Sequence, residues 1–203
     1  KGNTRLYIST QKLSYLTRKK YFVLATTLIL ASLTVCSLLF LISAEAIEKK
    51  CNPDPKTFRH YKNFPTGMVV PETLFLTSNG AHRSLKDYKG KGLVVNFWAT
   101  WCAPCIREMP QLNHLAALVK SHQIEVLTIS EDRNGKEIAS KYLKRNKFHN
   151  LPGLSDINGL LFRKFNLKGL PSTILINKDG IGIGIIIGIT EWDSPDAIKF
   201  IRK

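Results

Sequence analysis

The chain contains only four cysteines and five histidines in 203 residues, and none of them falls at the spacing of a zinc finger. It also contains no phosphate-binding loop, no dinucleotide-binding fingerprint and no internal repeat. These absences argue against nucleotide-dependent chemistry and repeat architectures, and we expect no cofactor and no bound metal. The five histidines have no metal-ligand spacing and no evident catalytic partner, so we assign them no role: His60, His82, His114, His122 and His149.

Acidic residues are scarce as well. The chain has 15 of them against 30 lysines and arginines, which gives a formal net charge of +15. The lysines are spread along the chain rather than clustered, a pattern that favours a solvated basic surface and does not indicate nucleic-acid binding. Such a surface would still be attracted to an anionic bilayer or to acidic protein partners.

Two of the cysteines lie in Trp101-Cys102-Ala103-Pro104-Cys105, directly after the apolar run Leu93–Trp98. A helix that begins at Cys102 places Cys105 one turn further on the same face, where the two sulfur atoms can bond. The unpaired N–H groups of the helix N-terminus would stabilise a Cys102 thiolate. We therefore expect Cys102 to be the nucleophile of a thiol-disulfide exchange and Cys105 to be the more buried, resolving cysteine. Half of a zinc site and a structural disulfide are the alternatives.

Three motifs follow one another along the chain: Asn96–Pro110 around the cysteines, Gly169–Thr173, and Gly188–Pro195. Together they resemble the thioredoxin superfamily, and most closely its membrane-anchored TlpA/ResA/CcmG-like branch. The resemblance covers the chain from about Met68 to its end. It implies a thioredoxin-like α/β fold with a central mixed sheet, an N-terminal β-hairpin and an inserted helix and strand, and the alternation of strand and helix patterns agrees with that class.

The resemblance also implies roles beside the cysteines. In the family the proline that matches Pro171 is cis and lies against the active-site sulfurs, and the backbone of the preceding residue, here Leu170, pairs with the substrate chain. Trp101, next to the nucleophile, is expected to be partly exposed and to offer a partner protein an apolar contact.

Asn96 stands where cytoplasmic thioredoxins carry a buried aspartate that moves protons. Glu108 lies three residues after Cys105 and matches a glutamate that the TlpA/ResA branch places near the buried sulfur. We expect Glu108 to accept the Cys105 proton, provided that burial raises the pKa of its carboxyl. The alternative is that Glu108 is a first-turn acid stabilised by the helix dipole.

Residues 21–44 contain no charged side chain and are long enough to cross about 30 Å of hydrocarbon as a helix. The basic residues Arg18-Lys19-Lys20 precede them and favour a cytoplasmic N-terminus. We therefore expect four segments: a cytoplasmic segment (1–20), a transmembrane anchor (21–44), a linker (45–67) and a thioredoxin-like domain (68–203). This predicts a single-pass protein of the bacterial inner membrane with its domain in the periplasm. A cleaved signal peptide is the alternative, because Ala44-Glu45-Ala46 fits a cleavage site.

The predicted activity is reduction of partner-protein disulfides by a membrane-anchored thiol:disulfide oxidoreductase. After each reaction in an oxidising compartment, the disulfide of a reductase must be reduced again, so the resemblance implies a transmembrane electron donor of the CcdA/DsbD type. It implies apocytochrome c, or the cysteines of copper chaperones and oxidase subunits, as substrates. A copper-binding module that uses Cys102 and Cys105 is one alternative. A peroxiredoxin-like peroxidase is disfavoured, since Val95 and Ala99 replace the Pro and Thr of its motif.

Apolar periodicity and turn residues predict the following elements: a hairpin from Leu74–Thr77 across Asn79-Gly80, strands at Leu93–Trp98, Glu125–Ser130, Ile174–Asn177 and Ile181–Ile189, helices at Cys102–Val119 and Lys136–Asn146, and a last helix capped by Ser194 with Pro195 at its first position. The resemblance implies that the helix Lys136–Asn146 and a strand after it, at about Gly153–Leu161, are the inserted elements. Phe97, Trp98 and Trp192 are expected to pack in the core.

Overall fold

The structure, a computed structural model, describes residues 53–64 and 68–202. Within these two ranges no helix combines the length and the apolar character that crossing a membrane requires. The predicted cytoplasmic segment and membrane anchor lie outside the described residues and stay predictions. The other two cysteines of the chain, Cys36 and Cys51, also lie outside them.

An eight-stranded mixed sheet forms the centre of the described chain, with the strand order β1-β8-β7-β4-β5-β6-β2-β3. β4 is parallel to β5 and β5 is parallel to β6, whereas the other neighbours are antiparallel. The strands are β1 (Tyr61–Asn63), β2 (Phe75–Leu76), β3 (His82–Arg83), β4 (Gly92–Trp98), β5 (Ile124–Ser130), β6 (Leu154–Asp156), β7 (Ser172–Ile176) and β8 (Gly182–Ile187).

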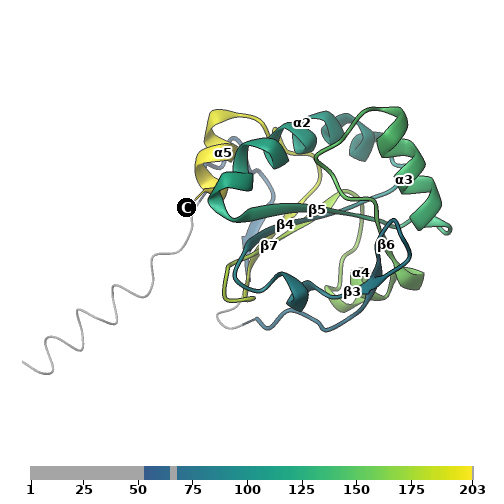
Figure 1. Cartoon of the computed structure of the whole chain (residues 1–203). Helices are drawn as coiled ribbons and strands as arrows, with labels where there is room; N and C mark the ends of the chain where they lie inside the picture. The colour runs from purple at the N-terminus through teal and green to yellow at the C-terminus, as the bar shows by residue number, and fades with distance from the viewer. Residues whose placement is uncertain (1–52, 65–67, 203) are drawn as a thin grey trace, which may run out of the picture. The chain divides into compact units, whose positions relative to one another are not determined.

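Helices cover both faces of the sheet (Figure 1). The α-helices are α2 (Ala103–Val119), α3 (Gly135–Arg145), α4 (Leu160–Lys164) and α5 (Pro195–Ile201), and the 3₁₀ helices are η1 (Leu85–Tyr88), η2 (Lys120–His122) and η3 (Ile157–Gly159). Successive residues of β4 point to opposite faces, so Val94 and Trp98 share one apolar cluster with α2, α3 and α5, while Val95 and Phe97 share another with α4 and η1. The thioredoxin-like α/β fold is confirmed.

Most predicted elements are present within one or two residues of their expected ends. Gly80 and Gly180 turn the β2–β3 and β7–β8 hairpins at φ of 85° and 80°, backbone conformations that glycine adopts without strain. The Ser194 hydroxyl accepts the N–H of Ala197 over 3.2 Å and begins α5, with Pro195 in its first turn.

The predicted strand Gly153–Leu161 is wrong over its second half. β6 ends at Asp156, whose carboxylate accepts the backbone N–H groups of Leu161 over 3.0 Å and Phe162 over 2.8 Å. These contacts satisfy N–H groups at the start of α4, so the chain turns into η3 and α4 instead of continuing the strand.

The described part of the segment expected as a linker, residues 53–64, contributes to the fold. β1 pairs with β8, and Phe58 is 3% exposed in the core cluster that also contains Trp192. β8 is therefore an inner strand, which accounts for its apolar glycine-rich sequence. At Gly184 an added Cβ would lie 2.7 Å from the Lys62 carbonyl oxygen, so only glycine lets β1 approach this closely.

Candidate active site

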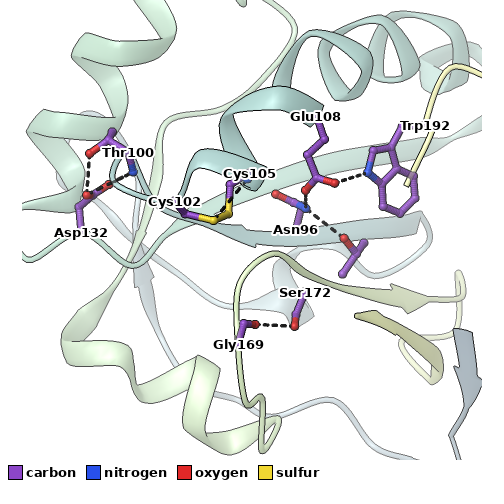
Figure 2. Close-up of a disulfide and its surroundings, with 10 residues drawn as sticks. Asn96, Thr100, Cys102, Cys105, Glu108, Asp132, Gly169, Ser172 and Trp192 are labelled. Atoms are coloured by element: carbon purple, nitrogen blue, oxygen red, sulfur yellow. Dashed lines mark hydrogen bonds between the residues drawn. A yellow bond between two sulfur atoms is a disulfide. The ribbon is translucent and has the colours of Figure 1, made fainter. Parts of the chain in front are cut away.

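Cys102 and Cys105 form a disulfide at the N-terminus of α2, with their Cα atoms 5.3 Å apart (Figure 2). Cys102 is the N-cap residue, and its sulfur accepts the backbone N–H of Cys105 over 3.3 Å. Pro104 occupies the first turn, where its missing N–H costs no hydrogen bond. Cys102 is 5% exposed and Cys105 is completely buried, so the cysteine expected to resolve the exchange is the more buried one.

The loop before Cys102 is held by Asp132, a contact that the sequence did not reveal. The Asp132 carboxylate accepts the Thr100 N–H over 3.0 Å, the Thr100 hydroxyl over 2.8 Å and the Ser130 hydroxyl over 2.8 Å. Asp132 lies just beyond β5, the strand next to β4, so the contact joins the two loops that follow these parallel strands. It fixes the position from which α2 begins.

The Leu170–Pro171 peptide bond is cis, as the resemblance implies. Pro171 is buried and accepts the Gly188 N–H through its carbonyl over 2.8 Å, and the Ser172 hydroxyl donates to the Gly169 carbonyl over 2.7 Å. These contacts shape the loop that faces the disulfide in Figure 2. The role of Pro171 and Leu170 in holding a substrate chain stays a prediction.

A groove of about 600 Å³ opens beside the disulfide. It is lined by Trp101, Cys102, Ala103, Pro104, Glu131, Phe162, Gly169 and Leu170. Trp101 is 70% exposed, in agreement with the sequence, and most of the other lining residues are apolar. Three predicted site residues, Trp101, Cys102 and Leu170, thus meet at one surface, and this surface is accessible to another chain.

Glu108 lies one helical turn beyond Cys105 and is 1% exposed. Its Oε1 accepts the Asn96 side-chain N–H over 2.8 Å, and its Oε2 accepts the Trp192 indole N–H over 3.0 Å. Asn96 also donates to the Thr173 hydroxyl over 3.0 Å, which links β4 to β7 (Figure 2). The first turn of α2 holds no acidic residue, so the alternative reading of Glu108 as a first-turn acid is wrong.

Burial raises the pKa of Glu108 from 4.5 to about 7. The hydrogen bonds from Asn96, Trp192 and the Thr190 backbone stabilise the carboxylate and pull the pKa down, but they do not offset the loss of solvent. A group that titrates near neutrality can both accept and return a proton under ordinary conditions. Trp192, expected only to pack, therefore also lowers the pKa of Glu108.

Glu131 is a groove residue that the sequence reasoning missed. Burial, followed by the nearby Asp156 carboxyl, raises its pKa from 4.5 to about 8. The only local signal is its position directly after β5, because side chains that follow the strand next to β4 lie at the sheet edge where α2 begins.

The described residues contain no group of three or more His, Cys, Asp or Glu side chains that could hold a metal ion. His114 lies 3.7 Å from the Asp193 carboxylate on the surface, and His149 is exposed. Within this part of the chain, no third ligand of these types lies beside Cys102 and Cys105.

Residues 66–181 match the AhpC/TSA family. The chain is 34% identical over 155 residues to the thiol-disulfide oxidoreductase ResA of Geobacillus kaustophilus, a match that covers 70% of this chain and 85% of the relative. It is 32% identical over 146 residues to the thiol-disulfide oxidoreductase ResA of Bacillus thuringiensis subsp. konkukian, covering 72% of this chain and 82% of that protein.

Solved structures share the fold. A thiol:disulfide interchange protein of the thioredoxin family from Chlorobium tepidum superposes with a TM-score of 0.56 at 23% identity, covering 69% of this chain and 99% of that one. StoA from Bacillus subtilis superposes with a TM-score of 0.52 at 23% identity, covering 64% and 98%.

Proposed function

This chain belongs to the AhpC/TSA family and is a thiol-disulfide oxidoreductase of the ResA type, and we propose that it works as a membrane-anchored reductase of protein disulfides. The surroundings of Cys105 are the observation that supports electron transfer from this protein to its partner. That cysteine is completely buried, and the next turn of α2 presents the buried Glu108 carboxyl rather than a cation.

The reduction potential of a dithiol depends on how well the protein stabilises the thiolates of its reduced form. The helix N-terminus stabilises a thiolate mainly at Cys102, its N-cap residue, because that favourable field weakens along the first turn. Burial disfavours a thiolate at Cys105, and an ionised Glu108 would disfavour it further. The disulfide is then the favoured state, and a protein whose disulfide is favoured donates electrons to its partners.

In the proposed reaction the Cys102 thiolate attacks one sulfur of a partner disulfide and forms a mixed disulfide. Cys105 gives its proton to Glu108 and attacks the Cys102 sulfur, which releases the partner as a dithiol and leaves the intramolecular disulfide. Trp101 supplies an exposed apolar contact for the partner, and Leu170 and Pro171 position the partner chain beside Cys102.

We further propose that residues 21–44 anchor the protein in the bacterial inner membrane and place the domain in the periplasm. The absence of charge in this segment and the basic residues before it support the proposal. In that compartment the disulfide must be reduced again, which calls for a transmembrane dithiol donor of the CcdA/DsbD type. Membrane fractionation of the full chain and of a variant that lacks residues 1–44 tests the anchor, since only the full chain should pellet with membranes.

The proposed substrates are proteins with paired cysteines that must be reduced before they bind haem or copper, namely apocytochrome c or copper-site proteins. A Cys105→Ser variant cannot resolve the mixed disulfide and should hold such a partner covalently on Cys102. Mass spectrometry of the trapped complex identifies the partner peptide. Trapping only of unrelated abundant thiol proteins would contradict this substrate class.

The direction of transfer is tested by equilibrating the full chain with glutathione or dithiothreitol redox buffers. A reduction potential of about −270 mV or below supports a reductase, whereas a value of about −120 mV would make the protein an oxidant. A Glu108→Gln variant measured in parallel reports how much of the value depends on the buried carboxyl.

A further inference from the structure

The resolving step moves a sulfur away from Cys102 toward the groove. In disulfide exchange the attacking, central and leaving sulfur atoms lie nearly in line. Cys105 attacks from the completely buried side of Cys102, so the partner's sulfur departs on the opposite side. That side is the groove lined by Trp101, Phe162 and Leu170. An alkyl thiolate that departs into apolar surroundings needs a proton.

Glu131 is the one carboxylic acid among the described residues that line the groove. Its backbone N–H donates to the Trp98 carbonyl over 2.8 Å, which fixes the residue at the end of β5 beside the start of the Cys102 loop. Its Oε1 is buried and has no hydrogen-bond partner within the described chain. No donor therefore stabilises an ionised carboxylate at that oxygen.

Loss of solvent is the largest influence on the pKa of this carboxyl. The Asp156 carboxyl at the end of β6 comes next, through its charge and through a side-chain hydrogen bond that favours the protonated form of Glu131, and Asp132 adds a smaller repulsion. Arg163 of α4 opposes them, but its guanidinium also donates to the Asn158 carbonyl over 2.7 Å. The resulting pKa of about 8 means that most Glu131 carboxyls are protonated at neutral pH, and a protonated carboxyl can give its proton to a departing thiolate.

We propose that Glu131 is the general acid that protonates the sulfur leaving Cys102. This inference rests on the proposed reductase function and adds a residue to it. Glu108 and Glu131 then serve opposite ends of the three-sulfur line: Glu108 takes the proton of the attacking Cys105, and Glu131 gives one to the departing sulfur.

The Cys105 sulfur forms a bond to the Cys102 sulfur, the bond between Cys102 and the partner's sulfur breaks, and its electron pair stays on the partner's sulfur. That sulfur takes the Glu131 proton and becomes a thiol, and Glu131 regains a proton from solvent. Over both exchange steps the protein loses two electrons and two protons and the partner disulfide gains both.

The test compares two disulfides whose leaving thiols differ in basicity. The full chain, reduced with dithiothreitol and freed of it, is mixed with glutathione disulfide or with the aryl disulfide 5,5′-dithiobis(2-nitrobenzoate). Protein oxidation is then followed from pH 6 to pH 9. The alkyl thiolate of glutathione needs a proton as it leaves, whereas the nitrothiobenzoate anion does not. For Glu131→Gln we expect about a ten-fold slower reaction with glutathione disulfide at pH 7 and less than about a two-fold change with the aryl disulfide.

Two further variants separate acid catalysis from structural damage. Glu131→Asp keeps a carboxylic acid and should recover part of the glutathione rate, while Glu137→Gln changes an exposed acid of α3 and should leave both rates intact. Urea unfolding verifies that each variant is folded. Equal slowing with both disulfides, or slowing with neither, overturns the role of Glu131. A wild-type protein that reduces neither disulfide overturns the reductase function itself.

Discussion

The indole N–H of Trp192 donates a 3.0 Å hydrogen bond to the Glu108 carboxylate across a sequence separation of 84 residues. Both side chains are buried, and Asn96 of β4 holds the second oxygen of the same carboxylate. The last of the three sequence motifs thus reaches into the active-site helix. Its tryptophan contacts the acid that we expect to take the proton of Cys105.

Trp192→Phe keeps most of the ring but removes this donor. Because the hydrogen bond stabilises the ionised carboxylate, its loss should raise the pKa of Glu108 further above its present value of about 7. Carbon-13 NMR titration of the glutamate carboxyl groups measures the shift. Trp98→Phe is the matched control, since Trp98 is equally buried and its indole N–H has no partner in the described chain. Equal shifts in both variants would contradict the prediction.

Glu108→Gln should change how stability depends on pH. The carboxyl ionises near pH 4.5 in the unfolded chain and near pH 7 in the folded protein, so the folded state binds more protons between these values. Wild-type stability therefore falls as the pH rises through this window, by up to about 3 kcal/mol. The variant cannot titrate there and should gain stability relative to the wild type by a similar amount. Urea unfolding of the oxidised proteins at pH 4.5 to 7.5 measures the difference, and parallel pH curves would refute it.

Trp101→Ala should weaken recognition without affecting the fold. The side chain is 70% exposed and lines the groove, so its loss should raise the KM for a protein disulfide by roughly ten-fold, while the rate with a small aryl disulfide changes little. Val69→Ala is a control with the same 70% exposure at a residue that does not line the groove. Comparable effects of the two substitutions on KM would show that Trp101 has no special part in docking.

Asp132→Asn should loosen the loop that precedes Cys102. An asparagine still accepts hydrogen bonds through one oxygen, but its NH₂ group faces a donor where the carboxylate now accepts from Thr100 or Ser130. We expect a loss of about 1–3 kcal/mol in urea unfolding, together with slower disulfide exchange. Asp179→Asn, in the exposed β7–β8 turn, should change neither quantity.

Local sequence patterns were sufficient for the elements whose signals are local. The apolar run of β4, the paired cysteines that begin α2, and the Ser194-Pro195 start of α5 each specify their structure within a few neighbouring residues. The position of Glu108 followed in the same way, because residues three apart on a helix share a face. The spacing of Cys102 and Cys105 likewise predicted their disulfide.

Features that depend on distant contacts could not be predicted. β1 has only three residues, and it is a strand because β8, more than 120 positions later, pairs with it. The early end of β6 depends on where the Asp156 side chain finds donors. Glu131 was missed because the groove it lines is assembled from four separate parts of the chain, and nothing next to it in sequence indicates its burial.

The pairing of β1 with β8 protects the sheet from edge-to-edge pairing with another molecule. β8 is an apolar strand, and without β1 its backbone N–H and C=O groups would be unpaired at the edge of the sheet. A strand of a second molecule could then pair with β8 and extend the sheet. β1 replaces that edge with a strand that carries the exposed Lys62, a charge that opposes further pairing. A shortened protein that begins at Met68 would therefore aggregate through β8, whereas one that begins at Pro53 keeps this edge covered.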